Sequence, residues 1–197
     1  MSNLYKTDAI LLDYSERNER DKLLVFYAKN FGKINILGKG VRSAQSKLGP
    51  NLALFSLLEI VFVAKKSFSS SNGNANGNNW LLTDAAEIDS FPSVKKNEKK
   101  FFLAGNWSLF LKRFIIGPQE DALLWKIILS GFDFLNKQNL NGEDLKNFDL
   151  LFKLNALKEL GHLNHEKIDF PLTLPQIAKN QKICEEILAQ SEKQSQL

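Results

Sequence analysis

The sequence predicts a two-part α+β protein, with a small β-barrel first and an all-α module after it. Residues 1–90 contain short apolar runs, rich in Ile, Val and Phe, that are separated by glycine-containing turns. From Phe91-Pro92 onward, apolar residues recur instead at three- and four-residue steps, as on one face of a helix. Charge divides similarly: residues 1–113 carry 17 Lys and Arg against 10 Asp and Glu, and residues 114–197 carry 9 against 12. A basic N-terminal module is therefore joined to a mildly acidic one.

Five strands are expected in the N-terminal module. Each is a run of strand-forming residues that ends near a turn, and the runs cover residues 5–13, 23–27, 33–37, 57–63 and 80–88. Five short strands joined by such turns are typical of a small barrel, because closure removes exposed strand edges. Residues 67–79, between the last two strands, are almost wholly Ser, Asn and Gly and predict a flexible hairpin tip.

Four helices are expected in the C-terminal module. The first ends at Gly117-Pro118, the second opens with Glu120-Asp121, the third spans 144–160 and a weaker one spans 176–189. The residues expected on the buried faces of the first three are Leu103, Trp107, Phe110, Leu111, Phe114, Leu123, Leu124, Ile127, Ile128, Phe132, Leu135, Phe148, Leu151, Phe152 and Leu157.

No catalytic or metal site is indicated, so the sequence predicts neither an enzyme nor a cofactor. The single cysteine, Cys184, excludes a disulfide within the chain and a multi-cysteine zinc site, and is expected to be buried. His162 and His165 are expected at the surface beyond a helix end rather than as a metal pair. The acids around Glu16 alternate with bases, which indicates a solvated turn rather than paired catalytic carboxylates.

The chain is expected to be soluble and cytoplasmic. Its start reaches Lys6 and Asp8 before any long apolar run, which argues against a secretory signal. No apolar stretch approaches the roughly 20 residues that span a bilayer. One cysteine suits a reducing compartment.

The strand-rich module carries a marked excess of positive charge. Between Lys29 and Lys66, six lysines and one arginine stand against a single acid, Glu59. A folded β surface that carries a positively charged loop is typical of proteins that bind nucleic acid. The candidate contacts are Lys33, Lys39, Arg42, Lys47, Lys65, Lys66, Lys95 and Lys96.

Several of these features have two interpretations. The glycines of Gly38-Lys39-Gly40 lack the spacing of a phosphate-binding loop and could equally be hairpin glycines. Lys95 and Lys96, expected at the start of the first long helix, either contact phosphate or form a solvated face. Lys112 and Arg113 suit the negative end of that helix, or form a basic notch for an acidic peptide. The aromatic residues Phe26, Tyr27, Phe31 and Phe62 are core residues or base-stacking platforms.

A set of motifs in fixed order resembles one bacterial family. The motifs are Thr7–Leu12, Glu19–Phe26, Phe31-Gly32-Lys33, Gly38–Arg42, Ser46–Gly49, Phe55–Glu59, Leu82–Phe91, Phe152-Lys153-Leu154 and Leu157–Gly161. Their order and spacing over residues 7–162 are similar to those of the RecO family of DNA repair proteins. The basic positions Lys33, Lys39, Arg42 and Lys47 match the basic region of that family.

The resemblance implies an N-terminal OB-fold over residues 1–82 and a helical domain over 90–197. It implies a non-enzymatic recombination mediator of the bacterial cytoplasm and nucleoid. Such a protein binds single- and double-stranded DNA, anneals strands and loads a recombinase with RecR. It also engages the acidic C-terminal tail of single-stranded-DNA-binding protein, and Lys112 and Arg113 are the candidate partner contacts. The alternative is an OB-fold scaffold that binds protein or RNA without annealing.

One departure from the family pattern concerns zinc. Many relatives carry a four-cysteine zinc element after the Leu-Gly helix end, whereas residues 162–197 here contain only Cys184. A shortened helical domain without a zinc element is therefore expected.

Overall fold

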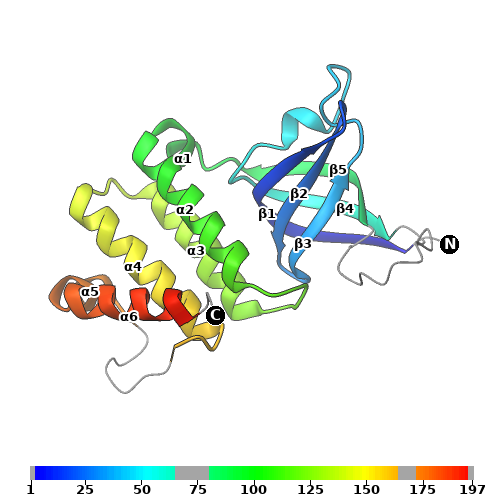
Figure 1. The fold of residues 1–197 in the computed structure, drawn as a ribbon. Helices are drawn as coiled ribbons and strands as arrows, with labels where there is room; N and C mark the ends of the chain where they lie inside the picture. The colour runs from blue at the N-terminus through cyan, green and yellow to red at the C-terminus, as the bar shows by residue number, and fades with distance from the viewer. Residues whose placement is uncertain (1–2, 65–79, 164–171, 195–197) are drawn as a thin grey trace. The chain divides into compact units, whose positions relative to one another are not determined.

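The computed structural model describes residues 3–64, 80–163 and 172–194 (Figure 1). The chain divides into two compact units: residues 1–91 with 116–122, and residues 92–115 with 123–197. The described strands belong to the first unit. The described α-helices belong to the second unit, except that Ala122, the first residue of one of them, is assigned to the first. The predicted α+β class, with a barrel before the helices, is confirmed. The domain limits 1–82 and 90–197 stay predictions.

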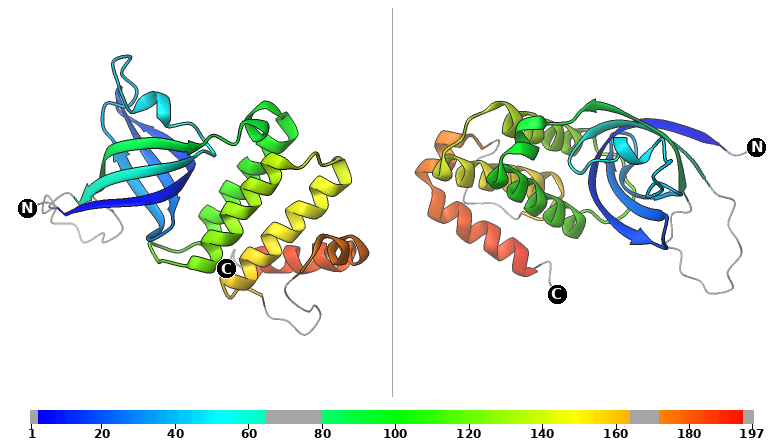
Figure 2. Two further views of the ribbon diagram at one scale, coloured as in Figure 1. Left: turned by 180° about the vertical axis from the view of Figure 1, so that it is seen from behind. Right: turned by 90° about the horizontal axis from the view of Figure 1, so that it is seen from above.

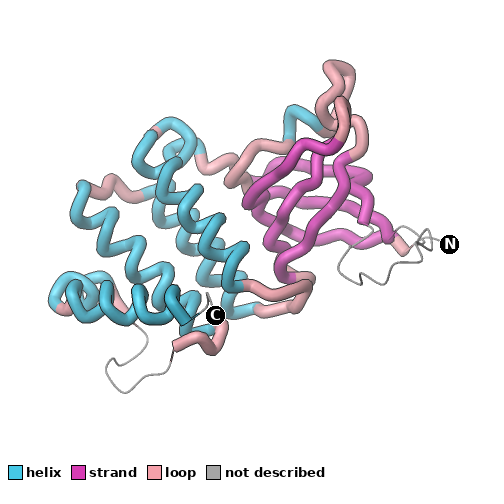
Figure 3. Tube along the Cα trace, viewed as in Figure 1, coloured by secondary structure: helices cyan, strands magenta, loops and turns pink. Residues whose placement is uncertain are grey.

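Five strands form a closed barrel in the first unit (Figure 3). They are β1 (Leu4–Arg17), β2 (Asp21–Ala28), β3 (Gly32–Gly38), β4 (Leu57–Ala64) and β5 (Trp80–Asp89). The order around the barrel is β1-β2-β3-β5-β4, and β4 pairs with β1 to close it. All pairs are antiparallel except β3–β5. This is an OB-like arrangement, and the five predicted strands are confirmed.

Alternation of apolar residues fills the barrel interior. In β3, Ile34 and Ile36 point inward and are at most 1% exposed, whereas Asn35 between them is exposed. The same period of two places Phe26 of β2 and Phe62 of β4 in the core. Each such side chain stabilises the fold by about 1.5–3 kcal/mol through burial. The alternation is therefore what fixes which strand residues remain on the outside.

The second unit is helical (Figure 2). Its helices are α1 (Pro92–Lys96), α2 (Glu98–Phe114), α3 (Ala122–Lys137), α4 (Gly142–Glu159), α5 (Leu174–Lys179) and α6 (Gln181–Gln194). The first and last predicted helices are each divided in two. Asn97 separates α1 from α2, and its side chain accepts a hydrogen bond from the backbone N–H of Lys100 as the N-cap of α2. Asn180 separates α5 from α6.

Trp107 of α2 is the centre of the helical core. Its ring stacks on Phe152 of α4 with centroids 3.9 Å apart, and its Nε1 donates to Asp149 Oδ1 at 2.8 Å. Gly131 of α3 allows this packing, since a Cβ there would lie 2.7 Å from the Phe152 ring.

One predicted core residue is wrong. Leu123 is 60% exposed, because the buried face of α3 is set by Leu124, Ile128 and Phe132 at four-residue steps. Leu123 lies one residue, about 100°, away from that face.

Candidate nucleic-acid interface

The loop between β3 and β4 closes one end of the barrel. It contains the short helix η1 (Gly49–Asn51), seen in cyan over the ring of strands in the right-hand view of Figure 2. Val41 and Leu52 of this loop enter the barrel core and are 5% and 6% exposed. A Cβ at Gly49 would lie 2.4 Å from the carbonyl oxygen of Val41, and Gly40 has a φ of +68°. The loop glycines thus serve its packing, which argues against a phosphate-binding loop. The hairpin interpretation is also wrong, because β5 lies between β3 and β4 and the loop crosses over it.

The loop is tied to the β1–β2 turn at the same end of the barrel (Figure 1). The backbone N–H of Arg42 donates to the Arg20 carbonyl at 3.0 Å, and that of Gly40 donates to Asp21 Oδ1 at 2.7 Å. The Arg42 side chain also donates to the Asn18 carbonyl at 3.0 Å. These bonds give the cations of the loop a defined position on the barrel.

The three cations of this loop differ in how much charge they present. Arg42 Nη2 lies 3.0 Å from Glu16 Oε2, and its side chain is 31% exposed. Lys39 and Lys47 are exposed, and neither forms an ion pair or hydrogen bond within the described parts of the chain. We call Lys39, Arg42 and Lys47 the loop cations. Two of them offer a full charge to solvent, and the third shares its charge with Glu16.

The other predicted contacts are not brought to this group. Lys33 is half-buried near the opposite end of β3, about 20 Å from Lys39 along the strand. Lys65 and Lys66 lie outside the described residues. The structure therefore gathers part of the predicted basic region, and the role of every predicted contact stays a prediction.

The sequence suggested that Lys95 and Lys96 begin one long helix. In the structure they end a short helix, α1, and the long helix α2 begins after them. Lys95 and Lys96 form the last turn of α1, in the helical unit, where cations suit the negative helix end. Lys100, in the first turn of α2, is only 6% exposed. Its Nζ donates to Ser93 Oγ at 2.9 Å and to the Gln138 carbonyl at 2.8 Å. Burial lowers the pKa of Lys100. This lysine is structural.

Sequence reasoning missed Arg17 and Arg20 as candidates. Both are exposed: Arg17 ends β1, and Arg20 lies in the β1–β2 turn, which Arg42 contacts. In the sequence they alternate with acids and suggest a neutral turn. The structure directs two of those acids, Glu16 and Asp21, toward the loop, where they bind Arg42 and a backbone N–H. No local pattern signals a pairing between residues so far apart.

The outer face of β1, β4 and β5 has the opposite charge. Asp8 and Glu59 are directly paired across β1 and β4 on this face. Lys6 Nζ lies 2.7 Å from Glu59 Oε1. The hydrogen bond and charge of Glu59, and then the charges of Asp8 and Asp84, raise the pKa of Lys6. Lys29 Nζ also lies 4.0 Å from Asp8 Oδ2, so both acids of this pair have a lysine beside them. Lys39 and Lys47 at the loop end have no such acid partner in the described residues, which suits that end to phosphate.

Three of the four aromatic residues that could have stacked on bases are core residues. Phe26, Tyr27 and Phe62 are at most 1% exposed. Phe31 is half-buried and contacts Phe62 edge to face, with centroids 5.3 Å apart.

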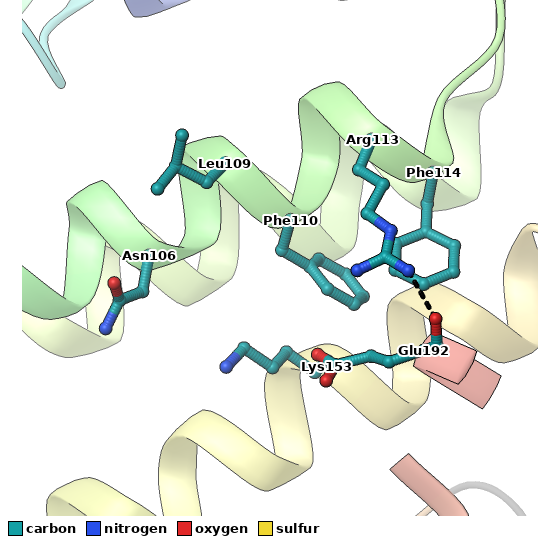
Figure 4. Close-up of a pocket in the computed structure, with 7 residues that line it drawn as sticks. All are labelled: Asn106, Leu109, Phe110, Arg113, Phe114, Lys153 and Glu192. Carbon is teal, nitrogen blue, oxygen red and sulfur yellow. Dashed lines mark hydrogen bonds between the residues drawn. The ribbon is translucent and has the colours of Figure 1, made fainter. Parts of the chain in front are cut away.

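A basic pocket occurs in the helical unit, between α2, α4 and α6 (Figure 4). Its volume is about 240 Å³, and it is lined by Asn106, Leu109, Phe110, Arg113, Phe114, Lys153 and Glu192. Arg113 donates to the Glu192 carbonyl, and Lys153 Nζ lies 2.8 Å from Asp149 Oδ2. Lys112 is half-buried beside Arg113 in the last turn of α2. The pocket combines aromatic walls with two cationic side chains.

Comparison with known proteins agrees with the fold and the motifs. The family model for the N-terminal part of recombination protein O matches residues 1–73. "DNA repair protein RecO" of Thermodesulfovibrio yellowstonii is 24% identical over 159 residues, and that of Clostridium novyi is 26% identical over 160 residues. Each alignment covers 81% of this chain. The N-terminal part of the chain thus matches the RecO family. The chain spans 58% and 57% of the lengths of these two relatives.

A shorter alignment has a higher identity. RecO of Desulfitobacterium hafniense is 32% identical over 69 residues, which are 35% of this chain and 25% of that relative. This chain has one cysteine, Cys184. Cys184 is fully buried, as predicted, and burial raises the pKa of its thiol.

The described segments contain no candidate metal site. Within residues 3–64, 80–163 and 172–194, no three His, Cys, Asp or Glu side chains are placed to hold a metal ion. His162 is exposed and its ring lies 5.3 Å from that of Phe114, whereas His165 falls outside the described residues. No helix in those segments is both long and apolar enough to cross a bilayer.

Proposed function

We propose that this protein is a DNA-binding mediator of recombinational repair that has no catalytic activity of its own. In this proposal it binds single- and double-stranded DNA, promotes annealing of complementary strands, and loads a recombinase together with RecR and single-stranded-DNA-binding protein. The match to the RecO family supports the role in repair. The observation that carries the DNA contact is the group of loop cations at one end of the barrel.

The proposed binding is electrostatic. Lys39 and Lys47 attract phosphates, and each neutralised phosphate releases a condensed counterion, so binding depends on salt and little on sequence. Arg42 is fixed between the loop and the β1–β2 turn, so it orients the backbone that the lysines attract. Two strands held near one positive group repel each other less, which favours their pairing. The acidic outer face around Glu59 repels DNA and restricts it to the loop end.

The pocket between α2, α4 and α6 is the proposed site for the tail of single-stranded-DNA-binding protein. An acidic tail that carries apolar side chains matches the chemistry of this pocket. Arg113 and Lys153 suit its carboxylates, and the rings of Phe110 and Phe114 suit its apolar groups. Lys112, which does not line the pocket, adds positive charge to the last turn of α2.

A strand-annealing assay, combined with separate binding measurements, tests the function. In the double variant Lys39→Ala/Lys47→Ala, both DNA affinity and annealing rate should fall by about fivefold or more at moderate salt. Lys6→Ala is the matched control, because Lys6 is an exposed lysine on the acidic face. It should change neither quantity.

Two results would count against the proposal. Tight DNA binding without any annealing by the wild type would favour the scaffold alternative. Equal affinities for the double variant and Lys6→Ala would show that DNA binds elsewhere.

A further inference from the structure

Helix α2 leaves one row of side chains uncovered by the rest of the helical unit. Lys99, Phe102, Asn106, Leu109 and Arg113 follow one another at steps of three, four, three and four residues. This is the spacing of a heptad seam, whose members lie on one helix face. Phe102 is 72% exposed and Leu109 is 63% exposed, and the other three are also exposed. We call these five residues the α2 seam. Two large apolar side chains exposed in register indicate a surface for another helix.

A glycine divides the seam at its middle. Gly105 lies one helical turn from both Phe102 and Leu109, and a Cβ built on it would meet nothing within 4 Å. Glycine weakens a helix interior relative to other residues, and no neighbour among the described residues requires it here. Because Gly105 has no side chain, a notch is left between Phe102 and Leu109. In knobs-into-holes packing, one side chain of a facing helix inserts into such a notch.

The charges at the seam select its partner. Lys99 and Arg113 stand at its two ends, about 21 Å apart, and the only acid of α2 is Glu98. A second copy of α2 would place cation against cation whether the two helices ran parallel or antiparallel. We propose that the α2 seam docks an acidic amphipathic helix of a partner protein. That helix would insert an apolar side chain at Gly105 and place carboxylates opposite Lys99 and Arg113.

This inference can be tested separately from the proposed tail site. Leu109 and Arg113 also line the pocket between α2, α4 and α6, so the seam and the pocket are continuous. Phe102 and Gly105 do not line the pocket. Variants at these two positions therefore test helix docking without touching the site proposed for the tail.

The test uses the full chain and a labelled synthetic helix of three heptads. The peptide has blocked ends, leucine at its seam positions and glutamate at the flanking positions, and a second peptide has lysine in place of glutamate. Fluorescence anisotropy should show the glutamate peptide binding at least about tenfold more tightly than the lysine peptide. Gly105→Leu should weaken binding at least about tenfold, because it fills the notch.

Thermal unfolding separates docking from misfolding. Gly105→Leu should raise the Tm by about 2 °C, because leucine is a better helix former and the added side chain meets open space. Phe102→Ser should weaken binding, whereas Leu123→Ser, which changes an exposed leucine on α3, should not. Equal binding of both peptides, or wild-type binding by Gly105→Leu, would overturn the proposal. A wild-type dimer that Gly105→Leu dissociates would assign the seam to a second copy and overturn it as well.

Discussion

Replacing Glu16 with glutamine should strengthen DNA binding, although it removes an ion pair. Glu16 Oε2 lies 3.0 Å from Arg42 Nη2, so part of the charge of Arg42 is compensated within the protein. Glutamine still accepts a hydrogen bond, and Arg42 keeps its bond to the Asn18 carbonyl, so the loop should hold its position. Because both side chains are partly exposed, the lost pair should lower stability by under about 1 kcal/mol.

The size of the gain follows from counterion release. One additional phosphate contact on single-stranded DNA steepens the plot of log affinity against log salt by about 0.7. If that contact adds nothing to the affinity near 1 M salt, the affinity for single-stranded DNA should rise about eightfold at 50 mM salt and about threefold at 200 mM salt. Fluorescence anisotropy with a labelled oligothymidine at several salt concentrations measures both the slope and the affinity.

A control with the same change in net charge separates the local effect from general attraction. Glu59→Gln removes an acid from the outer face of β4, where it pairs with Lys6. It should leave the salt slope unchanged. If Glu16→Gln behaves as Glu59→Gln does, then Arg42 does not contact DNA and the reasoning is refuted.

Two further predictions concern the helical unit. Gly131→Ala should lower the free energy of unfolding by about 1–2 kcal/mol in denaturant unfolding, because the new Cβ would lie 2.7 Å from the Phe152 ring. This overpacking costs more than alanine gains in helix propensity. An unchanged unfolding midpoint would contradict the packing described. Lys100→Met should lower stability by about 1–3 kcal/mol through the lost hydrogen bonds to Ser93 and Gln138. Burial lowers the pKa of Lys100 from its ordinary 10.5, so the unfolded state binds more protons in the window below 10.5. The stability of the wild type relative to Lys100→Met should thus grow as pH rises through that window, and a difference that shrinks would contradict the assignment.

Local patterns were sufficient to predict the barrel strands. Each strand is a run whose alternation, as in Ile34 and Ile36, is a property of neighbouring residues. The loop cations were predictable as a group for a similar reason, since Lys39 and Lys47 lie within one short loop. Lys33 belongs to the same stretch of sequence, but an extended strand carries it about 20 Å from Lys39.

The features that sequence reasoning missed depend on long-range contacts. The ion pair between Glu16 and Arg42 joins the end of β1 to the β3–β4 loop, which only the folded barrel brings together. This pair decides how much positive charge the loop presents. Lys100 is part of a basic run that suggests phosphate contact or a solvated face, yet it is buried against the end of α3. Leu123 was predicted to be buried because it neighbours the apolar face of its helix, and only packing places it outside.

The salt dependence of single-stranded DNA binding tests the central claim most directly. The claim is that exposed cations at one end of the barrel hold DNA by its phosphates. For Lys39→Ala/Lys47→Ala, the slope of log affinity against log salt should become shallower by about 1.4, while Lys6→Ala should keep the wild-type slope. Parallel lines for all three proteins would contradict the claim.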